Sequence, residues 1–211
     1  MSYLPFLQKK EPSPPPVIVV ASPADRLADL IIREASRFVG LREISPNRNW
    51  DNPSTPGNDA ALVAELKAMM VSTPWKVTWA YCAAFNEGVL KSALKKGGFD
   101  AALIESVART LDASVMSSFT ACEKKGLIRD TPTRGALFFW QNGTKWTGHA
   151  GIVSAWDGGS TMATIEANTS ANKTGDQREG DWITTKTRNR KGEGSFKARG
   201  FLWPEDILKM A

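Results

Sequence analysis

Histidine is almost absent from this sequence of 211 residues, since His149 is the only one. Cysteine is nearly as rare, because the chain contains only Cys82 and Cys122. A zinc site usually takes three or four Cys, His or carboxylate ligands at short spacings, so one histidine and two distant cysteines argue against such a site. Two cysteines are also too few for a disulfide framework. We therefore expect no metal ion and no other cofactor.

Long apolar runs are missing as well. No segment approaches the roughly 20 apolar residues that a membrane-spanning helix requires. Residues 17–20 are apolar, but this run is too short for the core of a signal peptide, and proline-rich sequence precedes it. If the protein works outside the cytoplasm, we expect it to leave the cell by a route other than a signal peptide.

Charge and tryptophan content give weaker indications. The net charge of +5 would suit an anionic polymer such as nucleic acid or cell wall, but no dense stripe of lysine and arginine is present. Internal repeats, CxxC pairs, phosphate-binding loops and nucleotide fingerprints are also lacking, so we expect no nucleic-acid partner. The eight tryptophans are many for this length. Most are expected in the core, although a groove that binds glycan or peptide would use several.

The chain divides into a short tail and one domain. Residues 1–24 include the run Glu-Pro-Ser-Pro-Pro-Pro, which favours an extended polyproline conformation and cannot join a helix. We interpret this segment as a disordered tail or linker rather than a peptide that docks on a partner. Residues 25–211 are enough for a single domain with its own core.

Helix signals precede strand signals along the domain. Capping residues and apolar periodicity predict helices at about 23–39, 58–70, 82–96 and 103–125, with loops at 45–58 and 170–180. Short apolar runs predict strands at 135–140, 149–156, 160–167, 182–187 and 201–203. This order favours an α+β fold, with N-terminal helices packed on an antiparallel β-sheet, over a parallel doubly wound fold.

The two cysteines lie at opposite ends of predicted helices. Cys82 falls in the first turn of its helix, where exposed N–H groups and the positive end of the helix dipole favour the nucleophilic thiolate. Cys122 falls near the end of a helix, shortly before Lys124 and Lys125, and is expected to be a small buried residue. Cys82 is therefore the better candidate for a nucleophile.

His149 begins a predicted β-hairpin whose turn is an Asp-Gly-Gly sequence at 157–159. If the two glycines form the loop, His149 faces Asn168. If the aspartate and the first glycine form it, His149 faces Glu166. Opposed residues have Cβ atoms about 5 Å apart, so either register gives the imidazole a polar partner that can orient a catalytic histidine. A purely structural histidine beside a carboxylate is the alternative.

These motifs together resemble the CHAP family of cysteine, histidine-dependent amidohydrolases/peptidases, relatives of the NlpC-type cell-wall peptidases with a papain-like core. The segment 39–44 is similar to the end of the first helix in bacterial and phage members. The main similarity lies in Tyr-Cys-Ala-Ala-Phe at 81–85, Gly-Ala-Leu-Phe-Phe-Trp at 135–140, Gly-His-Ala-Gly-Ile-Val at 148–153 and Ile-Glu-Ala-Asn-Thr at 165–169. The resemblance covers roughly residues 25–205 and implies a papain-like α+β fold.

The resemblance implies a role for each candidate catalytic residue. Cys82 would be the nucleophile and His149 the general base, and the backbone N–H of Cys82 would donate to the oxyanion. Glu166 and Asn168 match the family's Glu-x-Asn, and we favour Glu166 for the direct contact with the imidazole. One departure precedes the cysteine, where related sequences often have Pro-Trp and this chain has Ala80-Tyr81.

The implied substrate is an amide bond of peptidoglycan, cut as an endopeptidase or as an N-acetylmuramoyl-L-alanine amidase. Tyr81, Trp79 and Trp146 are the candidate substrate-binding residues. The protein would be made in the cytoplasm and reach the cell wall or periplasm after lysis, as a phage lysin, or by specialised secretion, as an antibacterial effector. In the second case an inhibitor (immunity) protein is a further candidate partner.

Two other interpretations stay open. The domain could be a catalytically silent module that binds the cell wall or builds a larger particle, and replacement of Cys82 would then have no effect on function. It could also be a cysteine enzyme that acts on a protein, as a deamidase or transglutaminase. A deamidated or isopeptide product would reveal that activity.

Overall fold

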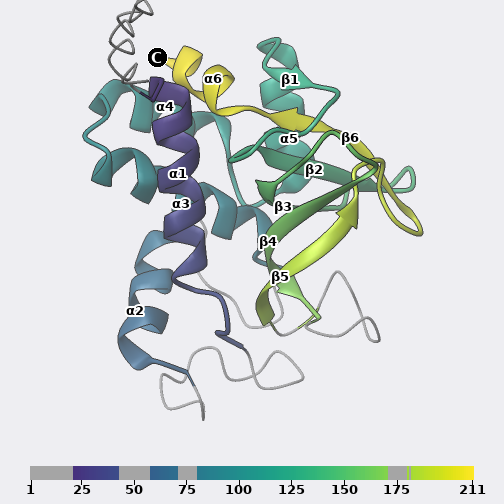
Figure 1. Ribbon diagram of the computed structural model, residues 1–211, viewed down its shortest axis with the longest axis horizontal. Coiled ribbons are helices and arrows are strands. Elements are labelled where there is room, and N and C mark those ends of the chain that lie inside the picture. The colour runs from purple at the N-terminus through teal and green to yellow at the C-terminus, as the bar shows by residue number, and fades with distance from the viewer. Residues whose placement is uncertain (1–20, 43–57, 71–79, 171–179, 181) are drawn as a thin grey trace, which may run out of the picture.

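Six helices and a six-stranded antiparallel sheet make up the described part of the chain (Figure 1). The computed structural model describes residues 21–42, 58–70, 80–170, 180 and 182–211. Its helices are α1 (Pro23–Ser36), α2 (Ala60–Met69), α3 (Cys82–Lys96), α4 (Ala101–Thr110), α5 (Val115–Lys124) and α6 (Pro204–Ile207), which a 3₁₀ turn (Leu208–Met210) follows. Its strands are β1 (Ile128–Arg129), β2 (Leu137–Asn142), β3 (Gly148–Ala155), β4 (Thr161–Thr169), β5 (Trp182–Asn189) and β6 (Phe196–Leu202). The predicted α+β class is therefore confirmed, and the arrangement is consistent with a papain-like fold.

Helix α1 begins where the sequence predicts. Ser22 caps it, because its hydroxyl oxygen accepts a hydrogen bond from the N–H of Asp25 at 3.0 Å and the Asp25 carboxylate accepts one from the N–H of Ser22 at 3.2 Å. Pro23 occupies the first helical position, where a missing N–H costs no hydrogen bond. The helix ends at Ser36, before the predicted end at residue 39, and turns follow up to Gly40, whose φ of 98° favours glycine.

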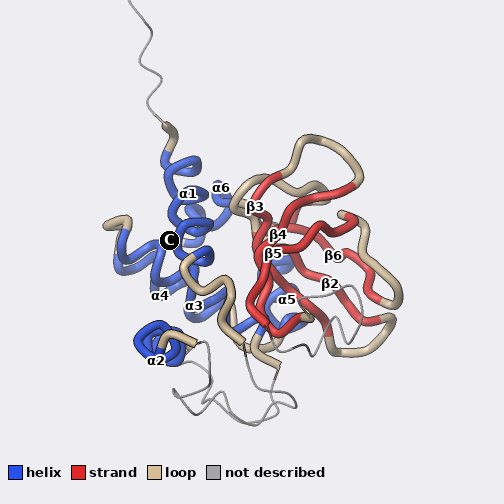
Figure 2. The backbone as a smooth tube through the Cα atoms, turned by 60° about the horizontal axis from the view of Figure 1, so that its bottom comes forward, coloured by secondary structure: helices blue, strands red, loops and turns tan. Residues whose placement is uncertain are grey.

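Helix α3 is the central helix of the fold. It packs against α1, α2 and α4 and against strands β3 and β4, and Figure 2 shows this group of helices beside the sheet. Phe85, Leu90 and Leu94 of α3 are completely buried. Phe85 also makes an edge-on contact with Phe38, which follows α1. Because α3 is held by packing along its length, the core fixes the position of its first residue, Cys82.

The single helix predicted at 103–125 is wrong, because the structure has two helices there, α4 and α5. Local side-chain hydrogen bonds make the break between them. The carboxylate of Asp112 accepts from the N–H of Ser114 at 2.7 Å, and the N–H of Asp112 donates to the Ser118 hydroxyl at 2.9 Å. Ser114 then caps α5. Cys122 lies in the last turns of α5 and is buried, as the sequence predicts.

The sheet has the strand order β1-β6-β2-β3-β4-β5, and its two faces carry separate apolar clusters. One cluster joins the sheet to the helices and includes Leu137, Phe139, Ala150, Ile152, Ile165, Ala167 and Ile183. The other cluster includes Phe138, Trp140, Val153, Met162 and Phe201. Since side chains alternate between the faces of a strand, His149 and Glu166 share the face of the second cluster.

All five predicted strands differ from their observed bounds by at least one residue, most clearly β2, β5 and β6, and β1 carried no sequence signal. Strand β2 starts two residues later than predicted, because Gly135 has a φ of 80° and so stands outside the strand. Strand β5 continues to Asn189, and β6 begins already at Phe196. The residues added to β5, Arg188 and Asn189, are both polar, and those added to β6 alternate between polar and apolar, so a search for apolar runs misses both.

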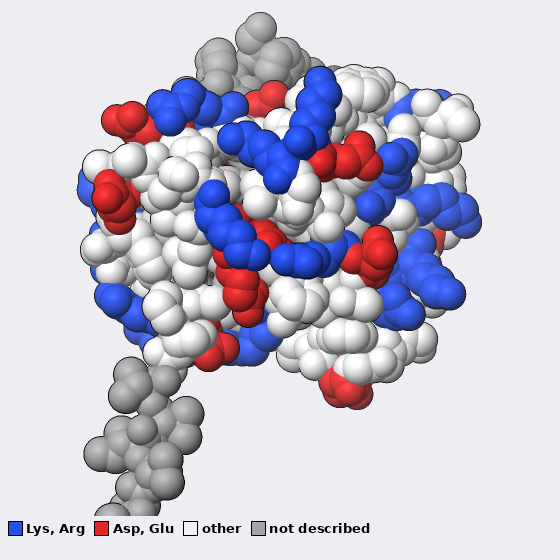
Figure 3. All heavy atoms as spheres, turned by 90° about the horizontal axis from the view of Figure 1, so that it is seen from above, with Lys and Arg blue, Asp and Glu red and all other residues white. Residues whose placement is uncertain are grey.

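Charged side chains of both signs are interspersed on the surface. On the face seen in Figure 3, acidic side chains lie between the basic ones, so this face carries no field of a single sign. Within the described ranges, no helix has both the length and the hydrophobicity needed to cross a bilayer. The predicted tail up to residue 20 and most of the loops at 45–58 and 170–180 lie outside the described residues.

Candidate active site

Cys82 is the first residue of α3, as the sequence predicts. Its side chain is buried, with 3% of the residue exposed, and Tyr81 occupies the N-cap position. The sulfur atom is hydrogen-bonded by the backbone N–H groups of Ala83 and Ala150, one from the first turn of α3 and one from β3. Both donors stabilise negative charge on sulfur, so the local backbone favours the thiolate.

His149 stands between the thiol and a carboxylate. Its Nε2 lies 2.9 Å from Oε2 of Glu166, and the ring also interacts with the Cys82 thiol, which raises the pKa of His149 and lowers that of Cys82. The other ring nitrogen, Nδ1, is buried and has no hydrogen-bond partner. Because Nε2 is engaged by Glu166, we assign the interaction with Cys82 to the Nδ1 side of the ring. The three side chains thus form a line from sulfur through imidazole to carboxylate.

The protonation states of the three groups support an ion pair. Burial by itself lowers the pKa of His149, but hydrogen bonds and charge interactions with Cys82 and Glu166 prevail and raise this pKa to about 9. Burial likewise raises the pKa of the Cys82 thiol, and the interaction with His149 outweighs it, so the net shift is downward. Both shifts favour a thiolate facing an imidazolium over a neutral thiol–imidazole pair.

Cys122 has the opposite character. Burial raises the pKa of its thiol to about 12, and the charge of Lys125 only partly opposes this shift. Its side chain is completely inaccessible. The thiol therefore stays protonated and inert under ordinary conditions.

The register of the β3–β4 hairpin explains why Glu166, rather than Asn168, contacts the ring. Ile152 pairs with Ile165, and continuing this register places Gly151 opposite Glu166 and His149 opposite Asn168. The expectation that this register makes Asn168 the direct partner of the ring is wrong, because Glu166 makes that contact. Gly151 has no side chain, so Glu166 lies across it and reaches His149 diagonally.

A prediction for Gly151 follows from this close approach. A Cβ atom at this position would lie 2.7 Å from Cγ of Glu166 and 2.6 Å from Cε1 of Phe138, so Gly151→Ala must displace the Glu166 side chain, the Phe138 ring beside His149, or both. We expect turnover per folded molecule to fall by roughly 10²-fold, the lower range for a misplaced acid–base group. Gly159→Ala, in the exposed turn of the same hairpin, is the matched control and should keep wild-type turnover. Equal turnover in the two variants would show that the diagonal contact does not matter.

Asn168 lies in an irregular part of β4. It is completely buried, and its φ of 56° makes it the one non-glycine residue with positive φ among the described residues. The pairing of β4 with β5 shifts between Glu166 and Thr169, so Asn168 sits in a bulge. Asparagine tolerates this conformation better than most residues, which gives it a structural role besides any role toward substrate.

Arg188 belongs to the site and was missed by the sequence analysis. Its guanidinium group holds Glu166 from β5, with Nε donating to Oε1 at 2.8 Å and one terminal nitrogen donating to Oε2 at 2.6 Å. Only 4% of the residue is exposed. The signal available was weak, because arginine in an alternating polar strand is typical of a solvated face, and the predicted strand stopped at residue 187.

The three candidate substrate-binding aromatic residues differ in their position relative to the site. Tyr81 is buried directly beside Cys82 in the chain. Trp146 lies in the connection between β2 and β3, is 64% exposed, and does not line the cavity next to His149. Trp79 lies outside the described residues.

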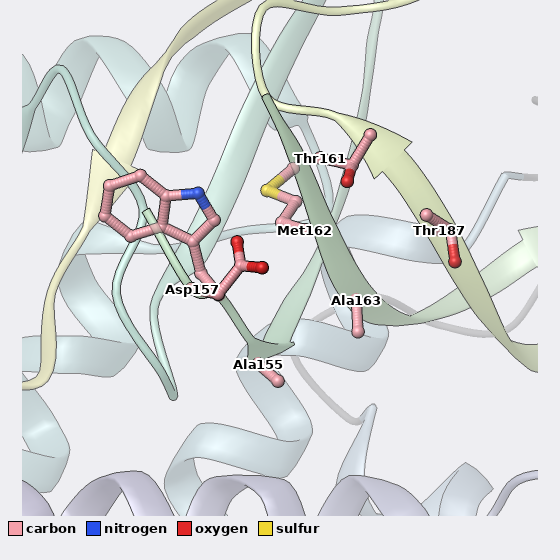
Figure 4. Close-up of a pocket in the computed structure, with 7 residues that line it drawn as sticks. Ala155, Asp157, Thr161, Met162, Ala163 and Thr187 are labelled. Carbon is pink, nitrogen blue, oxygen red and sulfur yellow. The ribbon is translucent and has the colours of Figure 1, made fainter. Parts of the chain in front are cut away.

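Cavities lie along the β3–β4 hairpin, and two of them bear on the extent of the site. One, of about 250 Å³, adjoins the site and is lined by His149, Trp140, Arg188 and residues 193–196. The other, of about 310 Å³, lies around the turn of the hairpin, where Figure 4 shows Asp157 and Met162 beside it. The second cavity begins at the far end of β3, about 20 Å from His149 at 3.3 Å per strand residue, so it is separate from the site.

The described residues contain no group of three Cys, His, Asp or Glu side chains placed to hold a metal ion. The side chains gathered at Cys82 are instead a thiol, an imidazole, a carboxylate and a guanidinium. Such a set can form and protect a nucleophile without further groups.

Comparison with known proteins gives one match. Residues 72–168 match the family model of the CHAP domain. This segment contains Cys82, His149, Glu166 and Asn168, and it ends before Arg188. No curated protein and no solved structure matches the chain.

Proposed function

We propose that this protein hydrolyses an amide bond of peptidoglycan with Cys82 and His149, because residues 72–168 match the CHAP domain, a cysteine/histidine-dependent amidohydrolase/peptidase domain found in cell-wall hydrolases. The family match supports a hydrolase of the peptidoglycan amidase or peptidase type in general. The observation that carries the catalytic assignment is the buried line from Cys82 through His149 to Glu166.

The first half of the reaction makes a thioester. The Cys82 sulfur attacks the carbonyl carbon of the scissile amide, and the carbonyl oxygen becomes an oxyanion. The backbone N–H of Cys82, at the start of α3, is the proposed donor to this oxyanion. His149 then gives its proton to the amine nitrogen, the C–N bond breaks, and the amine leaves.

The second half of the reaction restores the enzyme. Neutral His149 takes a proton from a water molecule as the water oxygen attacks the thioester carbon. The C–S bond breaks, the carboxylic acid product forms, and the sulfur leaves as the thiolate that His149, again protonated, stabilises. Glu166 holds the ring in one orientation and favours its charged form throughout.

We also propose that the protein reaches the cell wall after synthesis in the cytoplasm, by one of two routes. A cytoplasmic product that reaches the wall after lysis would act as a phage lysin, whereas one delivered by specialised secretion would act as an antibacterial effector. An inhibitor protein made by the producing cell would be the natural partner in the second setting.

Digestion of purified sacculi, followed by mass spectrometry of the released muropeptides, tests the proposed function. An endopeptidase exposes a new amino terminus within the stem peptide or cross-bridge, and an amidase separates the stem peptide from muramic acid. We expect one of these products with the wild-type protein and neither with Cys82→Ala. Intact sacculi after prolonged incubation with folded wild-type protein would contradict the proposal.

The pH dependence of turnover should be bell-shaped. The pKa of His149 is raised to about 9, so the imidazolium that protonates the leaving amine is lost as pH rises through about 9. The pKa of Cys82 is lowered, so the acid limb should lie below the usual range of a free thiol, about 8.5. Turnover measured across this range checks both limbs. An acid limb at the pKa of a free thiol would show that the ion pair does not form.

A further inference from the structure

The guanidinium of Arg188 is bound on every side. Besides the two bonds to Glu166, one terminal nitrogen donates to Oε2 of Glu193 at 3.0 Å and the other donates to the hydroxyl of Thr169 at 3.3 Å. The group also lies over the ring of Trp140, with its carbon 5.7 Å from the ring centroid. Its orientation is therefore fixed, and a flexible ammonium group could not reproduce the same set of contacts.

The carboxylate of Glu166 is saturated by its neighbours. Oε1 accepts from Arg188 and from the hydroxyl of Thr164, the latter at 2.6 Å, and Oε2 accepts from Arg188 and lies 2.9 Å from His149. Since both oxygens are held, the plane of the carboxylate cannot rotate away from the imidazole. The direction of the Glu166–His149 contact is thus set by Arg188, which holds both carboxylate oxygens, together with Thr164, which holds one.

Charge balance in the buried site also depends on Arg188. A Cys82 thiolate, a His149 imidazolium and the Glu166 carboxylate carry one net negative charge, which the guanidinium cancels. The remaining charged groups nearby are Glu193, whose side chain is 41% exposed, and the partly buried Lys186 on the same strand. A buried net charge is costly, so without Arg188 the site relieves it by binding a proton.

We propose that Arg188 is a positioning residue of this site, which aims Glu166 at His149 and supplies the positive charge that allows a thiolate and a carboxylate to be buried together. The inference rests on the proposed function for its effect on turnover, and it adds a residue beyond the segment that matches the CHAP domain.

Two substitutions separate the charge of Arg188 from its shape. Arg188→Met removes both, so the acid limb of Cys82 reactivity moves to higher pH by about one unit and turnover falls by 10²-fold or more, as roughly expected for loss of a charge near the site and for a misplaced acid–base pair. Arg188→Lys keeps the positive charge but loses the planar guanidinium that binds both oxygens of Glu166. The acid limb of Cys82 reactivity should therefore stay close to wild type, while turnover falls roughly tenfold.

The test uses the full chain and two independent readouts. Alkylation of Cys82 by iodoacetamide, measured across the acid and neutral pH range and located by mass spectrometry, reports thiolate without any substrate. Turnover and KM on solubilised peptidoglycan report catalysis. Arg190→Met, two residues further along the chain, where the backbone N–H donates to Ser160 at the hairpin turn, is the matched control and should match wild type in both readouts.

The outcomes are decisive in each arm. A folded Arg188→Met protein with the wild-type acid limb of alkylation overturns the proposal, because a merely structural role leaves the limb in place. If Arg188→Met does not fold, Arg188→Lys tests the proposal instead. Wild-type turnover in Arg188→Lys overturns the proposal that the two guanidinium bonds aim Glu166 at His149. Should the wild-type protein fail to hydrolyse peptidoglycan, the alkylation profiles still test Arg188, so the two failures are distinguishable.

A double-substitution cycle adds a check on the route of the effect. If Arg188 acts through Glu166, removing it from a Glu166→Gln background costs far less turnover than removing it from wild type. Additive losses would mean that Arg188 acts independently of Glu166, and the positioning role would be wrong.

Discussion

Cys82→Ala should abolish hydrolysis of purified sacculi, with a loss of at least about 10⁴-fold, while the melting temperature stays close to that of wild type. The loss is large because no other described thiol can replace the nucleophile, and removal of a nucleophile leaves only binding and oxyanion contributions. Stability should change little because the substitution keeps most of the side-chain volume at the helix start and removes a buried charge.

Cys122→Ala is the internal control for this experiment. The residue is completely buried in α5, and its thiol pKa is raised to about 12, so it takes no part in chemistry at ordinary pH. Its replacement should cost roughly 1 kcal/mol of stability through a small cavity and leave turnover per folded molecule unchanged.

Sacculus turbidity, muropeptide release and thermal unfolding measure both variants side by side. Retained hydrolysis by Cys82→Ala would remove the thiol mechanism altogether. Loss of hydrolysis by a folded Cys122→Ala protein would instead mean that the wrong cysteine has been assigned.

Glu166→Gln should lower turnover by something like 10²–10⁴-fold, the range for a general base that has lost its orienting partner. An amide can hold the ring but cannot stabilise the imidazolium, so the alkaline limb should also move below pH 9. The substitution leaves the buried Arg188 without its main counter-charge, which is strongly destabilising in general, by about 3–5 kcal/mol for a broken buried pair. Turnover must therefore be expressed per folded molecule.

A matched control for the stability cost is Glu34→Gln. Glu34 is also buried and ion-paired, to Lys96 at 2.7 Å and to Arg37 at 2.9 Å, but it lies on α1 away from the site. It should lose stability and keep its turnover. If both variants lose turnover in proportion to folded protein, Glu166 has only a structural role.

Asn168 provides the contrast within the same motif. Asn168→Ala should reduce turnover less than Glu166→Gln and raise KM, but alanine at a φ of 56° also strains the bulge. Asn168→Gly removes the side chain without this strain, so the difference between the two variants isolates the backbone effect. A larger turnover loss in Asn168→Gly than in Glu166→Gln would make Asn168 the principal orienting residue.

The parts of the site that the sequence predicts are those encoded by local signals. Helix α3 is marked by its apolar face, its terminal lysines and the glycines that follow, so the helix-start position of Cys82 can be derived without a structure. The Asp-Gly-Gly turn likewise predicts the hairpin and brings His149 to the same face as Glu166 and Asn168.

The features that the sequence does not predict depend on side-chain contacts that no local sequence signal encodes. The diagonal contact of Glu166 requires the space above Gly151, which pairing rules alone do not reveal. Arg188 reaches Glu166 from 22 residues away in the sequence, along a strand whose polar alternation is typical of an exposed face. The break between α4 and α5 depends on serine and aspartate hydrogen bonds that compete with helix only in context.

The family match ends at residue 168, whereas the sheet continues through β5 and β6. A transplant of residues 72–168 into another protein would carry Cys82, His149 and Glu166 but would leave Arg188 behind. It would also strip β4 of its hydrogen-bonded neighbour β5 and β2 of β6, exposing unpaired edges that invite aggregation. The unit that can be exchanged between proteins is therefore larger than the unit that sequence comparison delimits, and it extends at least from α1 to the end of β6.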